Sequence, residues 1–389
     1  MNVPKLRFKE FNDEWCYQSL SKYVNRITTK NKNNESDLVL TISAQYGLVD
    51  QTFFFNRSVS SSNLTGYYLL NNGDFAYNKS YSNGYPWGAI KRLNKYNQGV
   101  VSSLYICFKT NNLIDSNFLE QYFETNKWYQ QISEVSVEGA RNHGLLNIAV
   151  NDFFNTKHYI PSIKEQEKIS KFLSLLDKKI ELQSKKIEDL KLFKKGFIEF
   201  EFSNSNYNEI NLKEILKERK TYSEKGLEFP HVTLSKDGIY DKTDRYNRDF
   251  LVKSDDKKYK ITYLNDLCYN PANLKFGVIC LNEYGSAIFS PIYVTFVIKN
   301  IANPKYIKYY VTRNNFINAI RKYEQGTVYE RMAVAPEDFL KFSIKLPNIE
   351  IQNKFVVKLS KLDQKIELEN LKLSRYIKLK KGLMQNMFV

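Results

Sequence analysis

The residues best suited to chemistry lie in loops that combine asparagine, tyrosine and basic side chains. Asparagine can form two hydrogen bonds with adenine, arginine can do the same with guanine, and lysine pairs with phosphates. In the first half of the chain the candidate contact residues are Asn78, Lys79, Tyr81, Asn83, Lys91, Arg92, Arg141 and Asn142. In the second half they are Asn270, Asn273, Lys275, Thr327, Tyr329 and Arg331. Because the loops of the two halves carry different side chains, the sequence predicts that each half reads a different base sequence.

The same loops can also be plain surface hairpins without a ligand, and that alternative stays open for each of them. Two tyrosines beside the candidates, Tyr77 and Tyr269, are expected in the core, because large aromatic rings contribute most where they are packed.

Motifs for catalysis and metal binding are missing from the sequence. No GxxxxGK[ST] loop occurs, which argues against a motor or ATPase. The three histidines are scattered, and the four cysteines stand too far apart for a CxxC pair. The segment Asn270–Asn273 is weakly similar to the Asn-Pro-Pro-aromatic signature of amino-methyltransferases, but it lacks the second proline and the aromatic residue. We expect no catalytic residue and no metal site.

The composition is strongly basic and rich in aromatic residues. The 389 residues carry a formal charge of +16, with 28 Tyr and 26 Phe. Such a balance suggests a nucleic-acid partner. The start of the chain does not resemble a signal peptide and no long apolar run occurs, so we expect a cytoplasmic protein.

One segment of the chain occurs twice. Pro161 to Gly196 recurs as Pro347 to Gly382, at a constant offset of 186 positions. Within it, the heptapeptide Leu176–Leu182 differs from Leu362–Leu368 at one position of seven. This long period indicates a duplicated pair of domains with pseudo-twofold symmetry rather than a solenoid.

The repeated segment has the heptad spacing of a coiled-coil helix in both copies. The expected seam residues are Leu173, Leu176, Ile180, Ile187, Leu190, Leu359, Leu362, Ile366, Leu373 and Tyr376. Polar residues interrupt the seam at Gln183 and Lys194, and at the equivalent Glu369 and Lys380, where they can fix its register. We expect the two helices to begin just after Pro161 and Pro347 and to pack antiparallel; a parallel dimer is the alternative.

Outside the helices, the two halves are expected to be α+β domains. Residues 103–109 and 292–299 have the pattern of strands, and residues 117–132 and 304–323 have that of helices. The fold class is therefore two globular domains separated by two long helices in an antiparallel coiled coil.

These features resemble the DNA-specificity subunit of type I restriction-modification systems over essentially the whole chain. The Pro-x-Ile-x-x-Gln start and the Leu-Asp-x-Lys-Ile-Glu-Leu helix stand in both places where that family has them. The resemblance divides the chain into a first target-recognition domain, a central helical spacer, a second recognition domain and a C-terminal helical spacer. Their expected ranges are 1–158, 159–202, 203–345 and 346–389.

The resemblance implies a noncatalytic subunit that binds double-stranded DNA. Each recognition domain would read one half of a bipartite target and direct adenine methylation or restriction by partner subunits. The implied partners are two methyltransferase (modification) subunits and restriction/translocase subunits, with no membrane. S-adenosylmethionine, ATP and Mg would belong to those partners, and this chain would hold no cofactor.

Two other classes of protein remain open from the residues alone. A coiled-coil scaffold with two RNA- or protein-binding heads would share the duplication and the seam. An enzyme that modifies DNA by itself would need a cofactor loop or an acid-base cluster, neither of which the sequence contains.

Overall fold

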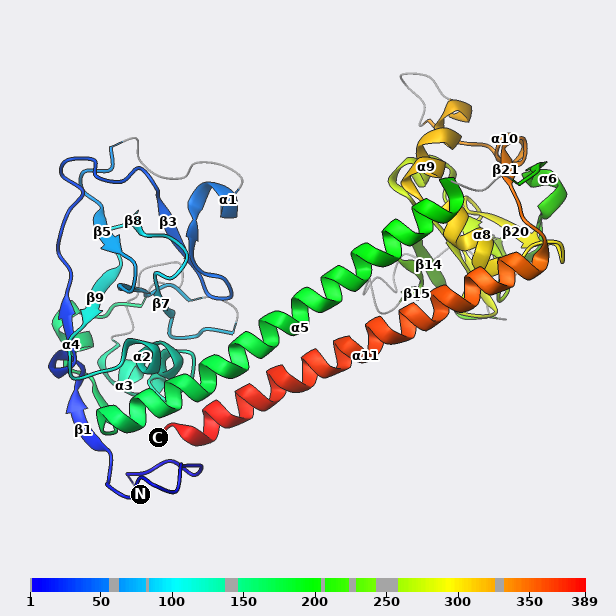
Figure 1. The fold of residues 1–389 in the computed structure, drawn as a ribbon. Coiled ribbons are helices and arrows are strands. Elements are labelled where there is room, and N and C mark those ends of the chain that lie inside the picture. Colours follow the sequence, from blue (N-terminus) through cyan, green and yellow to red (C-terminus); the bar gives the residue numbers. More distant parts are fainter. Residues whose placement is uncertain are drawn as a thin grey trace. The chain divides into compact units, whose positions relative to one another are not determined.

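The computed structural model describes residues 2–55, 63–81, 84–136, 146–203, 207–223, 229–242, 258–325 and 332–389. The chain divides into two compact units (Figure 1). Unit 1 comprises Met1–Ser184 and Leu371–Val389, and unit 2 comprises Lys185–Asn370. Each unit therefore contains part of both long helices, α5 (Ile163–Ser203) and α11 (Ile349–Met387). Both helices begin two residues after a proline, as predicted.

The strands of unit 1 form one four-stranded antiparallel sheet and three two-stranded sheets, in the orders β2-β9-β6-β7, β1-β10, β3-β4 and β5-β8. The strands are β1 (Cys16–Ser19), β2 (Val24–Arg26), β3 (Leu40–Ser43), β4 (Gly47–Asp50), β5 (Tyr68–Asn71), β6 (Phe75–Asn78), β7 (Ala89–Arg92), β8 (Gln98–Val101), β9 (Ile106–Thr110) and β10 (Lys157–Ile160). The helices besides α5 and α11 are η1 (Leu20–Lys22), α1 (Gln51–Phe55), α2 (Ser116–Phe123), α3 (Tyr129–Val135) and α4 (Val150–Asn155).

Unit 2 repeats this topology with one additional strand, which makes one of its small sheets three-stranded. Its four-stranded sheet has the order β12-β20-β17-β18, beside sheets β11-β21, β13-β16-β19 and β14-β15. The strands are β11 (Glu209–Asn211), β12 (Leu216–Glu218), β13 (Tyr222–Ser223), β14 (Val232–Ser235), β15 (Gly238–Asp241), β16 (Tyr259–Thr262), β17 (Leu267–Tyr269), β18 (Ile279–Leu281), β19 (Ala287–Phe289), β20 (Val294–Ile298) and β21 (Ser343–Lys345). The remaining helices are α6 (Leu212–Ile215), η3 (Pro271–Phe276), α8 (Pro304–Val311), α9 (Asn314–Ile320), η4 (Arg321–Tyr323) and α10 (Pro336–Leu340). The predicted duplication of α+β domains is confirmed.

Each four-stranded sheet is covered on both faces, because alternate side chains of a strand point to opposite sides. In β6, Phe75 and Tyr77 enter an aromatic cluster with residues of α2 and α4, whereas Ala76 enters a cluster with the small hairpins. In β17, Tyr269 and Cys268 are divided between two clusters in the same way.

Tyr77 and Tyr269 lie fully in the core, as the sequence predicts. Tyr77 stacks on Phe153 with ring centroids 5.1 Å apart, and Tyr269 stacks on Phe339 at 4.9 Å. The Tyr77 hydroxyl donates to Trp87 O at 2.7 Å, and the Tyr269 hydroxyl donates to Val334 O at 3.0 Å. Part of the aromatic content of the chain therefore lies in these two cores.

The two predicted helices that follow the sheets are each broken into shorter ones. Residues 117–132 form α2 and α3, and residues 304–323 form α8, α9 and η4. A threonine lies at each break. The Thr125 hydroxyl donates to Tyr122 O at 2.7 Å, and the Thr312 hydroxyl donates to Lys308 O at 2.8 Å. Such local hydrogen bonds compete with the helical pattern and end the helix.

Within each unit, the residues of the predicted seam are buried or half-buried. Leu173, Ile187 and Leu359 are buried, and the other seam residues are half-buried: Leu176, Ile180, Leu190, Leu362, Ile366, Leu373 and Tyr376. In unit 2 the ring of Phe197 on α5 stacks on that of Phe355 on α11, with centroids 5.8 Å apart.

The long helices run antiparallel in both units, since partner numbers on α11 fall as those on α5 rise. In unit 2, Lys186 pairs with Glu369 at 3.0 Å and Lys194 pairs with Asp363. In unit 1, Asp177 pairs with Lys380 at 2.6 Å, and Lys179 Nζ lies 4.6 Å from the centre of the Tyr376 ring. These contacts agree with the antiparallel prediction.

Candidate nucleic-acid interface

A glutamine ties the start of each long helix to its α+β domain. Gln166 is buried; its Oε1 accepts a hydrogen bond from the Asp115 backbone N–H at 2.7 Å, and its Nε2 donates to Pro161 O at 2.8 Å. Gln352 makes the equivalent pair with Asn303 N and Pro347 O, at the same two distances. Asp115 and Asn303 are the N-caps of α2 and α8, so the repeated glutamine orients those helices.

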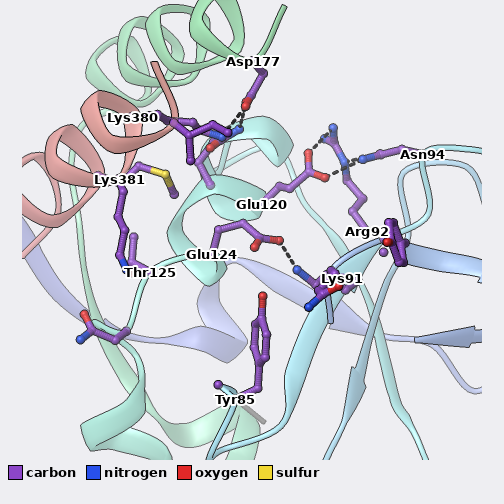
Figure 2. Close-up of a pocket in the computed structure, with 18 of the residues that line it drawn as sticks. Tyr85, Lys91, Arg92, Asn94, Glu120, Glu124, Thr125, Asp177, Lys380 and Lys381 are labelled. Atoms are coloured by element: carbon purple, nitrogen blue, oxygen red, sulfur yellow. Dashed lines mark hydrogen bonds and ion pairs between the residues drawn. The ribbon is translucent and has the colours of Figure 1, made fainter. Parts of the chain in front are cut away.

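A second tie joins three elements through an aspartate. In unit 1, Asp177 on α5 receives Lys380 from α11 and a hydrogen bond from Gln121 Nε2 on α2, at 2.6 and 2.9 Å. In unit 2, Asp363 on α11 receives Lys194 from α5 and the Tyr309 hydroxyl from α8, the latter at 2.9 Å. We call these the aspartate junctions; Figure 2 shows the one in unit 1.

Three polar interruptions of the seam, Lys194, Glu369 and Lys380, are therefore paired rather than solvated. Lys194 and Lys380 end on the aspartates of the opposite helix, and Glu369 is buried against Lys186. Burial, and then the neighbouring Asp363 carboxylate, raises the pKa of Tyr309. This tyrosine therefore stays protonated and donates its hydroxyl hydrogen.

The two asparagines that end the central strands have a common structural role. Asn78 Oδ1 accepts from Ser80 N at 3.0 Å, and Asn270 Oδ1 accepts from Ala272 N at 3.1 Å. Each side chain accepts from the backbone N–H two residues further on, which closes an Asx-turn. The turn places Lys79 and Tyr81 after β6, and Asn273 and Lys275 after β17.

Lys91 and Arg92 are neighbours on β7 but their charges are already matched by acids of α2 and its C-cap (Figure 2). Lys91 Nζ lies 2.5 Å from Glu124 Oε1, and an Arg92 guanidinium nitrogen lies 2.6 Å from Glu120 Oε2. These residues line a cavity of about 840 Å³ in unit 1, which Tyr85 and Lys381 also line. A ligand that approached Lys91 or Arg92 there would meet cations that are already paired.

The remaining described candidates differ in exposure. Tyr81 is 60% exposed. Lys79 is half-buried, its Nζ donates to Ile148 O at 3.2 Å, and burial lowers its pKa. Lys275 Nζ lies 5.3 Å from the ring centre of Phe276, which is itself 65% exposed. Tyr81 and the Lys275–Phe276 pair therefore present aromatic and cationic groups to the solvent.

Comparison with solved structures finds proteins with a similar fold. A structure of the assembly and conformational transition of the type I restriction-modification system contains a chain that matches with TM-score 0.58 and 14% identity, over 98% of this chain and 99% of that one. The S subunit from M. genitalium matches with TM-score 0.52 and 15% identity, over 100% and 99%. The HsdS subunit from Thermoanaerobacter tengcongensis matches with TM-score 0.50 and 14% identity, over 96% of both chains.

This chain has the type I S-subunit fold. No protein-family model and no curated protein matches its sequence.

Within this S-subunit fold, six predicted contact residues lie outside the part of the chain that the structure describes: Asn83, Arg141, Asn142, Thr327, Tyr329 and Arg331. Among the described residues, no group of three or more His, Cys, Asp or Glu side chains could hold a metal ion. None of the described helices is long and apolar enough to cross a membrane.

Two residues of the aspartate junctions, Gln121 and Tyr309, are not among those predicted from the sequence. They differ in type and belong to segments whose repeat is faint, so no motif marks them. A signal was present in their spacing. Each stands six residues after the N-cap of its helix, Asp115 or Asn303, and this equivalence appears once the caps are aligned.

Proposed function

We propose that this chain is the DNA-specificity subunit of a type I restriction-modification complex. Unit 1 and unit 2 would each read one half of a bipartite target, and the paired helices would act as the spacer between the readers. The observation that carries the proposal is a shared scaffold with unlike loops. The four-stranded sheets of the two units have the same strand order, and both units are tied to the helices by a glutamine and by an aspartate junction. The residues after the central strand differ, with Lys79 and Tyr81 in unit 1 and Asn273 and Lys275 in unit 2.

The contact residues of the proposal are those predicted from the sequence. Tyr81 is exposed, and Lys275 is half-buried beside the exposed ring of Phe276, so both could be reached by DNA. Lys91 and Arg92 are weaker members of the set, because binding to phosphate would have to break their pairs with Glu124 and Glu120.

The partners would be two methyltransferase subunits and restriction/translocase subunits, which would supply S-adenosylmethionine, ATP and Mg. This chain itself would be noncatalytic and would select the adenines that its partners modify.

Coexpression with a methyltransferase subunit of such a system tests the proposal, with modified adenines mapped by single-molecule sequencing. The expected result is methylation at one bipartite sequence with a fixed unread gap. Absence of any modified motif, with the complex intact, would refute the proposal and return the scaffold alternative.

A further inference from the structure

A basic pocket of about 360 Å³ lies in unit 2, where α5 meets the β14–β15 turn and the α8–α9 connection. Five basic residues line it: Lys191, Lys194 and Lys195 from α5, Lys236 from the turn, and Arg313 from the connection. Among the described lining residues Glu199 is the one acid. We call this site the basic pocket.

Two of the five cations are neutralised inside unit 2. Lys194 pairs with Asp363 in the aspartate junction, and Arg313 lies 3.7 Å from Glu199. The other three are Lys191, Lys195 and Lys236. All three are exposed, and no ion pair joins them to an acid in the ranges that the structure describes.

Three uncompensated lysines around one cavity repel one another and raise the local positive potential. An anion would relieve this repulsion. The ammonium group of lysine is well suited to phosphate, because it is a compact charge with three donors on a flexible stem.

In unit 1, the equivalent two lysines also comprise one that is paired and one that is exposed. Lys380 pairs with Asp177, and the next residue, Lys381, is exposed and lines the cavity that Figure 2 displays. The repeated Lys-Lys pair thus has two roles in both units. Its first lysine holds the aspartate junction, and its second projects into a cavity beside a hairpin turn.

The basic pocket adjoins the predicted base-reading loop of unit 2 through Lys236. A Cβ added to Gly277 would lie 3.8 Å from Lys236 Cγ, so the Lys236 stem passes over this glycine. Gly277 directly follows η3, which contains Asn273 and Lys275. In protein–DNA interfaces, phosphate contacts flank the contacts to bases. The closeness of Lys236 to this loop favours DNA, rather than an acidic surface of a protein partner, as the occupant of the basic pocket.

We propose that Lys191, Lys195 and Lys236 bind backbone phosphates of the DNA whose bases unit 2 reads. The inference rests on the proposed function and adds to it a sequence-independent contact made jointly by a spacer helix and a recognition domain.

The test uses the full chain in complex with its coexpressed methyltransferase. The double variant Lys195→Ala/Lys236→Ala is compared with Lys354→Ala/Lys358→Ala, which removes two exposed lysines of α11 in the same unit that do not line the pocket. Binding to a duplex with the mapped target and to a scrambled duplex is titrated between about 50 and 250 mM KCl.

Each lost phosphate contact should reduce the slope of log K against log salt by about 0.9, so the pocket variant should lose about two from the slope. Its Kd should rise up to about eightfold per lysine near 0.1 M salt, equally for target and scrambled DNA. The α11 control should keep the wild-type slope.

An unchanged slope and Kd in the pocket variant, beside specific binding by the wild-type complex, would overturn the phosphate site and leave the proposed function intact. Loss of methyltransferase copurification in the pocket variant alone would also overturn it, in favour of a protein partner. Equal binding of target and scrambled DNA by the wild type would instead refute the proposed function, while the slopes would still decide the pocket.

Discussion

Lys380 Nζ lies 2.6 Å from Asp177 Oδ1, and these two residues stand 203 positions apart in the chain. The equivalent pair in unit 2, Lys194 and Asp363, is formed by the opposite helices, so lysine and aspartate have exchanged their places on α5 and α11. This reciprocity explains why both copies of the repeated segment keep both residues. Each helix contributes the aspartate in one unit and the lysine in the other.

The junction pairs should couple energetically. Lys194→Ala and Asp363→Ala should each lower the free energy of unfolding by about 0.5–1 kcal/mol, because both side chains are partly exposed. The double variant should cost less than the sum of the two. Chemical denaturation of the four proteins in a double-mutant cycle measures the coupling. Strict additivity would show that the pair contributes nothing to stability.

The buried glutamines should matter more than exposed ones. Gln166→Leu leaves the Asp115 N–H and the Pro161 C=O without their partner, and each such buried group costs about 1–3 kcal/mol. Gln352→Leu should have a similar effect in unit 2. Thermal unfolding checks both, with Gln364→Leu on the exposed surface of α11 as the control. Equal midpoints for all three variants would contradict the proposed tie.

The N-terminal segment contacts α5 through two ion pairs, Arg7–Glu165 and Glu10–Lys168. The first should stabilise unit 1 far more than the second. The Arg7 guanidinium donates twice to the buried Glu165 carboxylate at 2.7 Å, which raises the pKa of Arg7. Arg7→Ala would leave the buried Glu165 carboxylate without its partner and should lower the free energy of unfolding by about 3 kcal/mol. Lys168→Ala breaks the exposed pair with Glu10 and the contact of Lys168 Nζ with the Phe8 ring, 5.1 Å from its centre, and should cost about 1 kcal/mol. Thermal midpoints of the two variants should differ accordingly.

His158 should make unit 1 sensitive to acid. It is fully buried between the Tyr122 hydroxyl and the Thr156 hydroxyl, and burial lowers its pKa to about 3. An unfolded histidine titrates near about 6.5, so the unfolded state binds the additional proton between these values. The stability that the neutral ring contributes is complete above about pH 6.5 and is lost as the pH falls toward 3.

The corresponding measurement compares unfolding of the wild type and of His158→Gln between about pH 4 and 7. Because carboxylates also titrate in this range, the difference between the two proteins reports on the histidine. The wild type should lose stability more steeply on acidification. Parallel curves would show that His158 contributes nothing to the pH dependence.

The aspartate junctions also restrict how the proposed spacer can be lengthened. Seven residues inserted into α5 between Asp177 and Lys194 would move these two about 10 Å further apart along the helix, while Asp363 and Lys380 would keep their separation on α11. One junction must then break. We expect impaired modification from the single insertion and recovery when α11 receives a matching heptad between the same residues.

With both insertions, the unread gap in the DNA target should lengthen by up to about three base pairs, at roughly 3.4 Å per base pair. Sequencing of modified adenines checks this directly. An unchanged gap in an active double insertion would contradict the role of the helices as the spacer.

The sequence alone determined the features that depend on local periodicity or on repetition. The heptad spacing located the seam that buries Leu173 and Leu359, and the constant offset revealed two equivalent α+β units. Tyr77 and Tyr269 could be assigned to the core because strand alternation and side-chain size are legible in a few consecutive residues.

Only the tertiary structure decided which polar groups are committed to one another. The partners of Asp177, on α2 and α11, are 56 and 203 positions away, and nothing in the sequence marks Gln121 as one of them. Likewise, Lys91 and Arg92 read as candidate DNA contacts until the fold places Glu124 and Glu120 beside them. Hydrogen bonds and ion pairs depend on distances of a few ångströms between segments, and those distances exist only once the chain has folded.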